Sequence, residues 1–396
     1  MKDETRILSL VGSLALDATP AEPFAEETIE FLTALSERIR SLPRVDAGEE
    51  LRALGFWLRR AHLADLKERY GRSGSLGLGI TFHIAPSNVP LMFLYSCAIA
   101  LLAGNSCRVR VSGRRTEECE KACRLLADLL RESRFTDMKN RINILAYDRS
   151  CTDLTEQFSR ECDARIIWGG DRTVEEIRRI PLKSSAAELA FPDRTSIAVL
   201  DAGAIMALEE EECRNLAGRF YNDTYAMDQN ACSCPRIICW EETDETTGRL
   251  ASKRFWNAVA AASKRYALSE IKVSRKYGSL WECAGLHPEI QTLRHWDNRL
   301  YVMEISSLSE KTAAWPMQFG SFLEYHMKNE DDWTHAVTEK VQTLTFFGIP
   351  REELLKQTLR HRLRGIHRIV PVGQALSMDL IWDGKDLIQS LSRTIG

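Results

Sequence analysis

The sequence lacks the patterns that define several large classes of protein. No G-x-G-x-x-G follows a predicted strand and there is no Walker lysine motif, so neither the usual dinucleotide fingerprint nor a P-loop is indicated. The eleven cysteines are scattered without C-x-x-C pairs. This spacing argues against a zinc ribbon and a disulfide framework, and it favours a reducing cytoplasm. No histidine pair has metal-ligand spacing with a carboxylate, so we predict no metal site.

Charge excess and long apolar runs are also lacking. A net charge of −3 over 396 residues gives no indication of nucleic acid or an anionic membrane as partner. The longest apolar run, residues 89–103, is shorter than the roughly twenty residues that a membrane span needs, so we expect a buried helix. Residues 7–16 resemble the apolar part of a signal peptide, but Asp3 and Glu4 have the wrong charge for its start.

What is present is a long alternation of strand and helix patterns. With 396 residues, 44% of them hydrophobic, the chain is long enough for two or three domains. Residues 24–42 and 47–70 carry helical apolar stripes and predict an N-terminal helical layer. From about residue 75, apolar strands are separated by helical stretches of about 10–15 residues, which is typical of βαβ units and a parallel sheet. The alternation continues beyond residue 200, through a predicted last strand at 368–372 and a closing helix at 384–392.

One polar loop interrupts this alternation. It follows a helix predicted at 209–220, contains Asp228, Gln229 and Asn230, and carries Cys232 before a strand predicted at 235–240. Loops held between rigid elements are common places for reactive groups, and polar neighbours can stabilise a thiolate. The alternative is an inert cysteine, since most free cysteines are buried as small apolar residues.

Several short stretches, taken in order, resemble one superfamily. Residues 86–90 (Pro-Ser-Asn-Val-Pro), 103–106 (Ala-Gly-Asn-Ser) and 168–171 (Trp-Gly-Gly-Asp) resemble elements of the aldehyde dehydrogenases, and Cys232 falls at the position of their nucleophile. From residue 75 onward the chain resembles more closely the LuxC-like acyl-CoA reductases of fatty-aldehyde synthesis. The stretches that carry this closer resemblance are 82–90, 102–106, 168–171, 188–194, 221–223, 228–232, 342–348 and 368–376.

The resemblance implies a fold and a division of the chain. We expect an α/β, aldehyde-dehydrogenase-like architecture with two Rossmann-type three-layer α/β/α domains and an N-terminal helical segment. The helical segment comprises residues 1–74, the NADP(H)-binding domain residues 75–203, and the catalytic domain residues 204–396.

The resemblance also assigns catalytic roles. Cys232 would attack a thioester carbonyl, and Asn88 together with the backbone N–H of Cys232 would stabilise the oxyanion. Cys234 and Cys239 are less favoured as nucleophiles, and an Asx turn between two prolines is the alternative for Asn88. Glu188 lies where hydrolytic members have a water-activating glutamate. It is predicted either to be catalytic, handling the aldehyde proton, or merely to pair with an arginine.

Cofactor contacts are implied on two predicted strands. Arg110 stands where most members have a lysine that reaches the adenosine ribose, and Ser112 follows it. Gly113 replaces the glutamate of many NAD-selective members, which removes a charge that would repel a 2′-phosphate, so we favour NADPH over NADH. Gly169, Gly170 and Asp171 would bring backbone and a helix N-terminus to the pyrophosphate. The alternative for Gly169 and Gly170 is an ordinary strand-to-helix turn. The alternative for Arg110 is a solvated basic face at the end of a strand.

The activity that follows is NADPH-dependent reduction of an acyl thioester to an aldehyde through an acyl-cysteine. The donor would be acyl-CoA or another acyl carrier. Two rival hypotheses remain: an aldehyde dehydrogenase in the oxidising direction, and an acyl-accepting subunit active only with an acyl-protein synthetase partner. A homo-oligomer is compatible with the resemblance. We interpret His83, on a predicted strand face, as a structural histidine, and Trp315, Phe319 and Phe322 as either core or the lining of an acyl tunnel.

Overall fold

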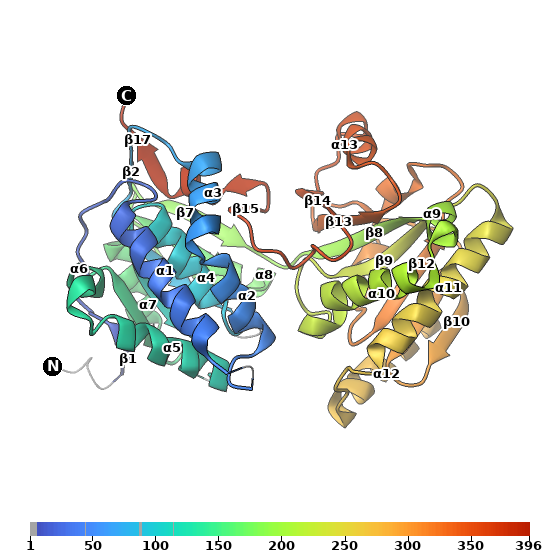
Figure 1. The fold of residues 1–396 in the computed structure, drawn as a ribbon, viewed down its shortest axis with the longest axis horizontal. Coiled ribbons are helices and arrows are strands. Elements are labelled where there is room, and N and C mark those ends of the chain that lie inside the picture. The colour runs from blue at the N-terminus through green and yellow to red at the C-terminus, as the bar shows by residue number, and fades with distance from the viewer. Residues whose placement is uncertain (1–5, 44, 87–88, 114) are drawn as a thin grey trace. The chain divides into compact units, whose positions relative to one another are not determined.

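The computed structural model describes residues 6–43, 45–86, 89–113 and 115–396, and divides into two compact units (Figure 1). The first unit contains the chain up to residue 192 and again from residue 378, and the second contains residues 193–377. No helix of these described ranges is long and apolar enough to cross a membrane.

The N-terminal helical layer of the first unit is present. It consists of α1 (Glu26–Ser41), α2 (Glu49–Trp57) and α3 (Arg60–Tyr70). The apolar stripe of α1, which includes Phe31, Leu35 and Ile39, is completely buried, so hydrophobic burial rather than capping explains its position. Residues 47–70 form two helices instead of one continuous helix.

The sheet of the first unit has strand order β1-β5-β4-β3-β6-β7. Apart from the antiparallel β1 (Leu8–Gly12), all of its strands are parallel. The parallel strands are β3 (Ile80–Ile84), β4 (Ser106–Val111), β5 (Ile142–Ala146), β6 (Ala164–Trp168) and β7 (Ala187–Phe191). The chain proceeds outward from β3 to β4 and β5, and then returns to the other side of β3 with β6 and β7. This reversal is the topological switch of a doubly wound sheet, and ligands bind at the carboxyl ends of the strands there.

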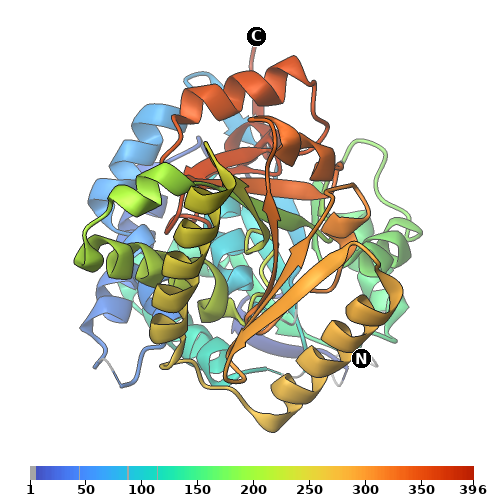
Figure 2. The same ribbon diagram turned by 90° about the vertical axis from the view of Figure 1, so that its right-hand side faces the viewer.

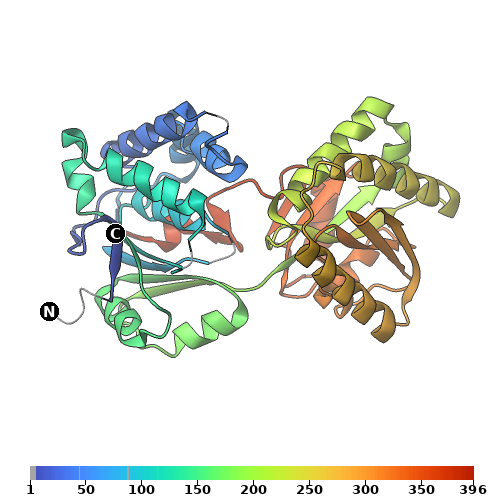
Figure 3. The same cartoon turned by 90° about the horizontal axis from the view of Figure 1, so that it is seen from below.

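Helices cover both faces of this sheet, as expected for near-continuous apolar strands. One face packs against α1, α4 (Met92–Leu102) and α5 (Glu117–Leu129). The other face packs against α7 (Thr152–Glu161) and α8 (Asp171–Arg178). Figure 3 shows the blue and teal helices on one side of the first unit and the green ones on the other. The shorter α6 (Thr136–Lys139) precedes β5.

The second unit has a sheet of order β10-β11-β12-β9-β8-β13-β14, in which only the β10–β11 pair is antiparallel among the described strands. Its strands are β8 (Thr195–Asp201), β9 (Pro235–Glu241), β10 (Ile290–Trp296), β11 (Leu300–Ile305), β12 (Ser321–His326), β13 (Val341–Phe347) and β14 (Arg368–Pro371). One face packs against α9 (Ala202–Ala207), α10 (Glu210–Thr224) and α11 (Glu245–Ser263), and the other against α12 (Glu270–Leu286) and α13 (Arg351–Arg360). Figure 2 turns this unit toward the viewer.

The limits of the two units differ from the predicted limits at both ends of the second unit. β8 pairs with β9 and β13, so the second unit begins at residue 193 and not at 204. The last residues return to the first unit, because β17 (Ser392–Thr394) pairs with β2 (Ser75–Gly77) and Asn105 Nδ2 donates to the carbonyl of Leu391 at 2.8 Å. The predicted closing helix at 384–392 was too long, since it reduces to α14 (Leu387–Ser390) after the short β15 (Ile381–Trp382) and β16 (Lys385–Asp386).

The run that resembles the apolar part of a signal peptide is structural. Residues 8–12 form β1, which pairs antiparallel with β5 at the edge of the first sheet. Val11 is buried in the core of this unit.

Candidate active site

The loop that carries Cys232 is a chain of tight turns. After α10 and a short 3₁₀ segment at 225–227, Asp228 and Gln229 adopt left-handed φ values of 53° and 60°. Such values are uncommon for residues other than glycine, so the surrounding contacts must hold them. The backbone N–H of Gln229 donates to the carbonyl of Thr224 at 2.8 Å, which closes the first turn.

The side chain of Gln229 ties this loop to a neighbouring strand. It is completely buried, its amide nitrogen donates to the Ser321 carbonyl at 2.9 Å, and its oxygen accepts from the Gly320 N–H at 3.0 Å. A buried amide that satisfies both of its polar ends stabilises one loop conformation and is not available as a base or ligand.

The backbone around Cys232 is held from a second direction. The Ser196 hydroxyl donates to the carbonyl of Cys232 at 2.7 Å and accepts from the N–H of Thr343 at 3.2 Å. Ser196 thereby links the loop to the amino ends of β8 and β13. Sequence reasoning did not identify Ser196, because a serine at the start of an apolar strand carries no signal of a partner 36 residues away.

The neighbouring cysteines are less suited to nucleophilic attack than Cys232. Cys234 is completely buried, and this burial raises the pKa of its thiol to about 12. Burial also raises the pKa of Cys239, which lies within β9. Cys232 itself is half-buried. Since the thiolate is the reactive form, burial disfavours both thiols as nucleophiles at neutral pH.

Two stretches of the family resemblance meet at Asp223. Its carboxylate accepts from the backbone N–H groups of Gly373 at 2.5 Å and Ala375 at 2.9 Å, while burial raises its pKa to about 6. Asp223 therefore fastens the end of α10, from which the Cys232 loop departs, to the segment that follows β14. Asn88, which is predicted to stabilise the oxyanion together with the backbone N–H of Cys232, lies outside the described residues.

The predicted cofactor residues on β4 lie at the carboxyl edge of the first sheet. Arg110 is level with Ile84, the last residue of β3, and its guanidinium lies 4.8 Å from the ring centre of Tyr147. Its Nε is buried and has no hydrogen-bond partner among the described residues. An unmet donor of this kind at the switch point fits an anionic ligand. Ser112 follows at the end of the strand, half-buried.

Beyond Ser112 the chain offers room for a ligand. Gly113 is exposed, and a Cβ atom placed on it would meet no atom of the described residues within 4 Å. Arg115 contacts the carbonyl of Gly113 at 3.5 Å, whereas Arg114 lies outside the described residues. This end of β4 is therefore open and basic, which fits the phosphorylated ribose of a dinucleotide.

The glycine turn after β6 lies on the other side of the switch point. Gly170 is the N-cap of α8 and Asp171 is its first residue. A Cβ on Gly169 would lie 3.0 Å from the side chain of Thr173, so a larger residue would crowd the first turn. Arg110 thus lies near the carboxyl end of β4, Ser112 directly follows β4, and Gly169, Gly170 and Asp171 follow β6. The carboxyl ends of these two strands share one edge of the sheet.

Glu188 lies at the other end of this sheet. It pairs in register with Arg165, near the amino ends of β6 and β7, whereas Trp168 and Phe191 mark the carboxyl ends. Its carboxylate accepts from Arg165 Nε and from Arg178 Nε, both at 2.9 Å, and Arg165 is 2% exposed. The contacts support the alternative in which Glu188 pairs with arginine, because it neutralises a buried guanidinium.

His83 is a structural histidine, as interpreted from its strand position. It lies on β3, where Nδ1 is 2.6 Å from the Ser96 hydroxyl and Nε2 is 2.9 Å from the Thr81 hydroxyl. Burial lowers its pKa to about 3, so the ring is neutral. Trp168 Nε1 also donates to Ser96, at 2.8 Å, which completes the network.

The aromatic residues considered for an acyl tunnel are buried. Trp315 stacks on His287 at 3.8 Å within the core on the α12 side of the second sheet, and Phe322 is buried in the core on the opposite side. Phe319 is 5% exposed and has a left-handed φ of 55°. Trp315 and Phe322 therefore belong to different layers of the core and do not line one channel.

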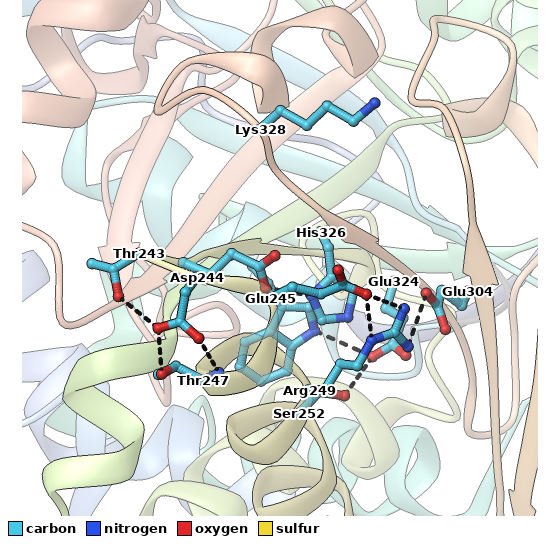
Figure 4. Close-up of polar contacts among 12 residues, drawn as sticks. Thr243, Asp244, Glu245, Thr247, Arg249, Ser252, Glu304, Glu324, His326 and Lys328 are labelled. Atoms are coloured by element: carbon cyan, nitrogen blue, oxygen red, sulfur yellow. Dashed lines mark hydrogen bonds and ion pairs between the residues drawn. The ribbon is translucent and has the colours of Figure 1, made fainter.

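A second polar cluster lies toward the carboxyl ends of β9 and β12 in the second sheet (Figure 4). Its centre is Glu324, which is completely buried and whose Oε2 accepts from Trp240 at 3.2 Å, Ser252 at 2.9 Å and Trp256 at 2.8 Å. Arg294 donates to its Oε1. A carboxylate with four donors has little capacity left for chemistry, so we assign this cluster to the packing of α11 and β10 on β12.

The arrangement of two doubly wound sheets defines the class of the protein as the aldehyde dehydrogenase fold. A salicylaldehyde dehydrogenase from Pseudomonas putida G7 superimposes with a TM-score of 0.65 at 11% identity, covering 94% of this chain and 85% of that one. A 1-pyrroline-5-carboxylate dehydrogenase from Thermus thermophilus gives 0.63 at 13% identity, covering 94% and 81%. At these identities the likeness establishes the fold alone.

The family follows from the sequence. The profile described as "Acyl-CoA reductase (LuxC)" matches residues 56–394, and the chain belongs to this family. Among its relatives is the "Long-chain acyl-protein thioester reductase" of Vibrio harveyi, which is 26% identical over 302 residues. That match covers 74% of this chain and 58% of the relative, so the chain spans somewhat more than half of the relative's length.

Proposed function

We propose that this chain reduces an acyl thioester to an aldehyde, with Cys232 as the nucleophile and NADPH as the reductant. The observation that carries the proposal is the construction of the Cys232 loop. Gln229 and Ser196 hold its backbone from two sides, and Cys232 is half-buried while Cys234 is sealed in the core. A fixed backbone around a half-buried thiol is suited to positioning a nucleophile against a carbonyl.

The reaction divides into two steps at this thiol. The Cys232 thiolate attacks the thioester carbonyl, the carrier thiolate leaves with the electron pair of its C–S bond, and an acyl-cysteine forms. A bound NADPH would supply the hydride that reduces this acyl-cysteine. The resulting thiohemiacetal then releases the aldehyde and returns the electron pair to the sulfur of Cys232. We assign oxyanion stabilisation to the backbone N–H of Cys232 and to Asn88.

The contacts of Glu188 favour reduction over hydrolysis. A hydrolytic aldehyde dehydrogenase needs a carboxylate that can take a proton from water, but Glu188 accepts from two arginines near the amino ends of its sheet. Because both of its oxygens are engaged, we assign no proton transfer to Glu188. The acyl-cysteine would then persist until it is reduced.

We assign the cofactor to the first unit. Arg110 with its unmet Nε, and the open space at Gly113, support a phosphorylated ribose and hence NADPH in preference to NADH. Gly169 and Gly170, before the N-terminus of α8, support the approach of a pyrophosphate. The donor is proposed to be acyl-CoA or an acyl carrier. The Vibrio harveyi relative is named as a reductase of acyl-protein thioesters, which supports an acylated protein as an alternative donor. We therefore propose an acyl-protein synthetase as a partner, and a reducing cytoplasm as the location.

The first experiment uses purified protein, NADPH and acyl-CoAs of several chain lengths, with loss of NADPH absorbance and trapped aldehyde as readouts. Cys232→Ala is expected to lower aldehyde formation by at least about a thousandfold and to abolish labelling by radioactive acyl-CoA, because no acyl-enzyme forms. Cys234→Ala is the matched control and should retain labelling. Labelling of the Cys232→Ala variant, or release of acid from an aldehyde without CoA, would contradict the proposal.

A further inference from the structure

The second unit contains a cavity to which the proposed reaction assigns no role. Its volume is about 740 Å³, within the range of small-molecule sites, and every residue that lines it belongs to residues 193–364. It lies at the amino ends of β8, β9 and β13, where Thr195, Arg236 and Lys340 contribute to its wall. We call it the basic cavity.

The charge of the basic cavity is opposite to that of the whole chain. Its wall contains five arginine and lysine side chains against three carboxylates, whereas the chain carries a net charge of −3. One of those carboxylates, Glu339, already pairs with Arg364. The remaining excess of positive charge, together with apolar wall residues such as Val337 and Leu363, fits an anion attached to a less polar group.

Two irregularities in the parallel sheet meet at the basic cavity. Ser196 is opposite Pro235 but Ile197 is opposite Ile237, so Arg236 is an extra residue in β9. Between β8 and β13 the register shifts in the same way at Gln342. Shifts of this kind re-aim side chains, are rare in parallel pairs, and are frequent beside functional sites.

Two polar atoms of the wall lack partners within the described part of the chain. Thr195 is 7% exposed and its Oγ1 has no hydrogen bond, and the buried Nε of Arg236 has none either. Leaving a buried donor or acceptor unmet costs about 1–3 kcal/mol, so such groups call for a ligand.

The basic cavity adjoins the loop of the nucleophile. Thr195 directly precedes Ser196, whose hydroxyl donates to the carbonyl of Cys232, and Arg236 is four residues after Cys232. A ligand in the cavity would therefore lie at the same end of the second sheet as the Cys232 loop. The residues proposed to bind NADPH all belong to the first unit, so we do not assign this cavity to the cofactor.

We propose that the basic cavity binds the phosphate-bearing part of the acyl donor's thiol carrier, with Arg236 and Thr195 as hydrogen-bond donors to the anion. This inference rests on the proposed reduction of an acyl thioester and names the part of that substrate that the second unit recognises. The phosphate can come from free coenzyme A or from a phosphopantetheine arm on a carrier protein.

The test compares thioesters that carry the same acyl chain on coenzyme A, on phosphopantetheine and on phosphate-free N-acetylcysteamine. Arg236→Gln is expected to raise KM for acyl-CoA about tenfold or more, the effect of one charge-assisted hydrogen bond, and to change KM for the N-acetylcysteamine thioester by less than about twofold. An equal effect on the phosphopantetheine thioester would assign the contact to the phosphate of the arm. An effect confined to acyl-CoA would assign it to the nucleotide phosphates.

Thr195→Val separates ligand binding from folding. Removing an unmet buried hydroxyl should leave the melting temperature unchanged or raise it, while KM for acyl-CoA rises. Arg214→Gln, on the exposed face of α10 where Arg214 pairs with Glu210, is the matched control and should alter neither quantity.

The failure of this inference can be told from failure of the proposed function. Calorimetric titration of coenzyme A into the Cys232→Ala variant reports on the basic cavity without turnover, and binding that Arg236→Gln weakens would support it even if no thioester were reduced. Equal KM values of the wild-type protein for phosphorylated and phosphate-free thioesters, unchanged in Arg236→Gln, would overturn it. The inference would also be overturned if Arg236→Gln impaired acyl transfer only from a donor protein that carries no phosphopantetheine.

Discussion

The change Gly113→Glu tests the assignment of NADPH with one added carboxylate. Gly113 is exposed, its φ lies outside the left-handed region, and a Cβ on it meets no atom within 4 Å in the part of the chain that the structure describes. A glutamate can therefore be placed there without strain. It would lie three residues beyond Arg110, next to the proposed site of the 2′-phosphate, and would restore the charge that many NAD-selective relatives are expected to have.

The size of the effect follows from Coulomb's law. A carboxylate about 5 Å from a phosphate with nearly two negative charges is repelled by roughly 1.5–3 kcal/mol at the high effective dielectric constant of an exposed site. This corresponds to an increase of about 10- to 100-fold in KM for NADPH. NADH has no 2′-phosphate, and its ribose hydroxyl can donate to the new carboxylate, so its KM should not rise.

The assay measures kcat/KM for both nucleotides at low and high salt, with Gly113→Gln as the uncharged control of the same size. We expect the preference for NADPH to fall only in Gly113→Glu, and the difference between the two variants to shrink in high salt because the repulsion is screened. Equal losses in both variants would show that volume rather than charge matters. A wild-type protein that uses NADH more efficiently than NADPH would refute the assignment outright.

Three further predictions concern carboxylates: two that pair with arginine inside the fold and one that is desolvated near another carboxylate. Glu188→Gln should lower stability by about 2–3 kcal/mol, because the buried Arg165 loses its counter-ion, while acylation of the protein persists. Glu50, whose pKa burial and the neighbouring Glu118 raise from 4.5 to about 7, takes up a proton on folding between these values. The free-energy cost of holding an ionised Glu50 in the folded protein is therefore absent below about pH 4.5 and complete above about pH 7. Glu50→Gln should consequently stabilise the protein by about 1 kcal/mol at pH 8 and much less at pH 5. Glu324→Gln should cost about 3 kcal/mol, since four donors lose their anionic acceptor.

Thermal melting with matched controls checks all three. Glu176→Gln is the control for Glu188, and it removes the exposed pairs with Arg149 and Arg172. Glu245→Gln is the control for Glu324, and it removes the exposed pair with Arg249. Each exposed pair is expected to contribute less than about 1 kcal/mol. A Glu188→Gln variant that is stable but forms no aldehyde would restore a catalytic role for this carboxylate. A stability difference for Glu50→Gln that does not depend on pH would contradict the pKa shift.

The sequence allowed most of the strands to be predicted, because parallel strands buried on both faces are continuous apolar runs. The strands β3 to β6, β8, β9 and β11 to β14 were predicted in this way, although β4, β12 and β13 also carry polar residues. The antiparallel β10, which is largely exposed, was not predicted. The helix α12 was missed because its apolar residues do not all face the core, and Trp281 and Leu286 are 74% and 66% exposed. β7 was missed because Glu188 interrupts its apolar pattern.

The limits of the units depend on pairings that no local pattern contains. β17 pairs with β2 across more than 300 residues, and β8 is assigned to the second unit by its ladders with β9 and β13. The site shows the same limit. Resemblance predicted Cys232, Arg110 and Gly169 by position, but the contact between Gln229 and Ser321 joins residues 92 apart in the sequence and follows only from the folded chain.

The polar residues of the Cys232 region divide into those that shape the loop and the one proposed to react. Asp223 and Gln229 each use both polar ends on backbone groups, and Ser196 both donates and accepts. Groups with satisfied hydrogen bonds have no capacity for proton transfer without breaking the fold. The hydrogen bonds of Gln229, Ser196 and Asp223 therefore position the backbone from which the Cys232 sulfur projects, and we assign none of these three groups to proton transfer. Such a site suits acyl transfer followed by reduction, because an acyl-cysteine without an activated water survives until it is reduced.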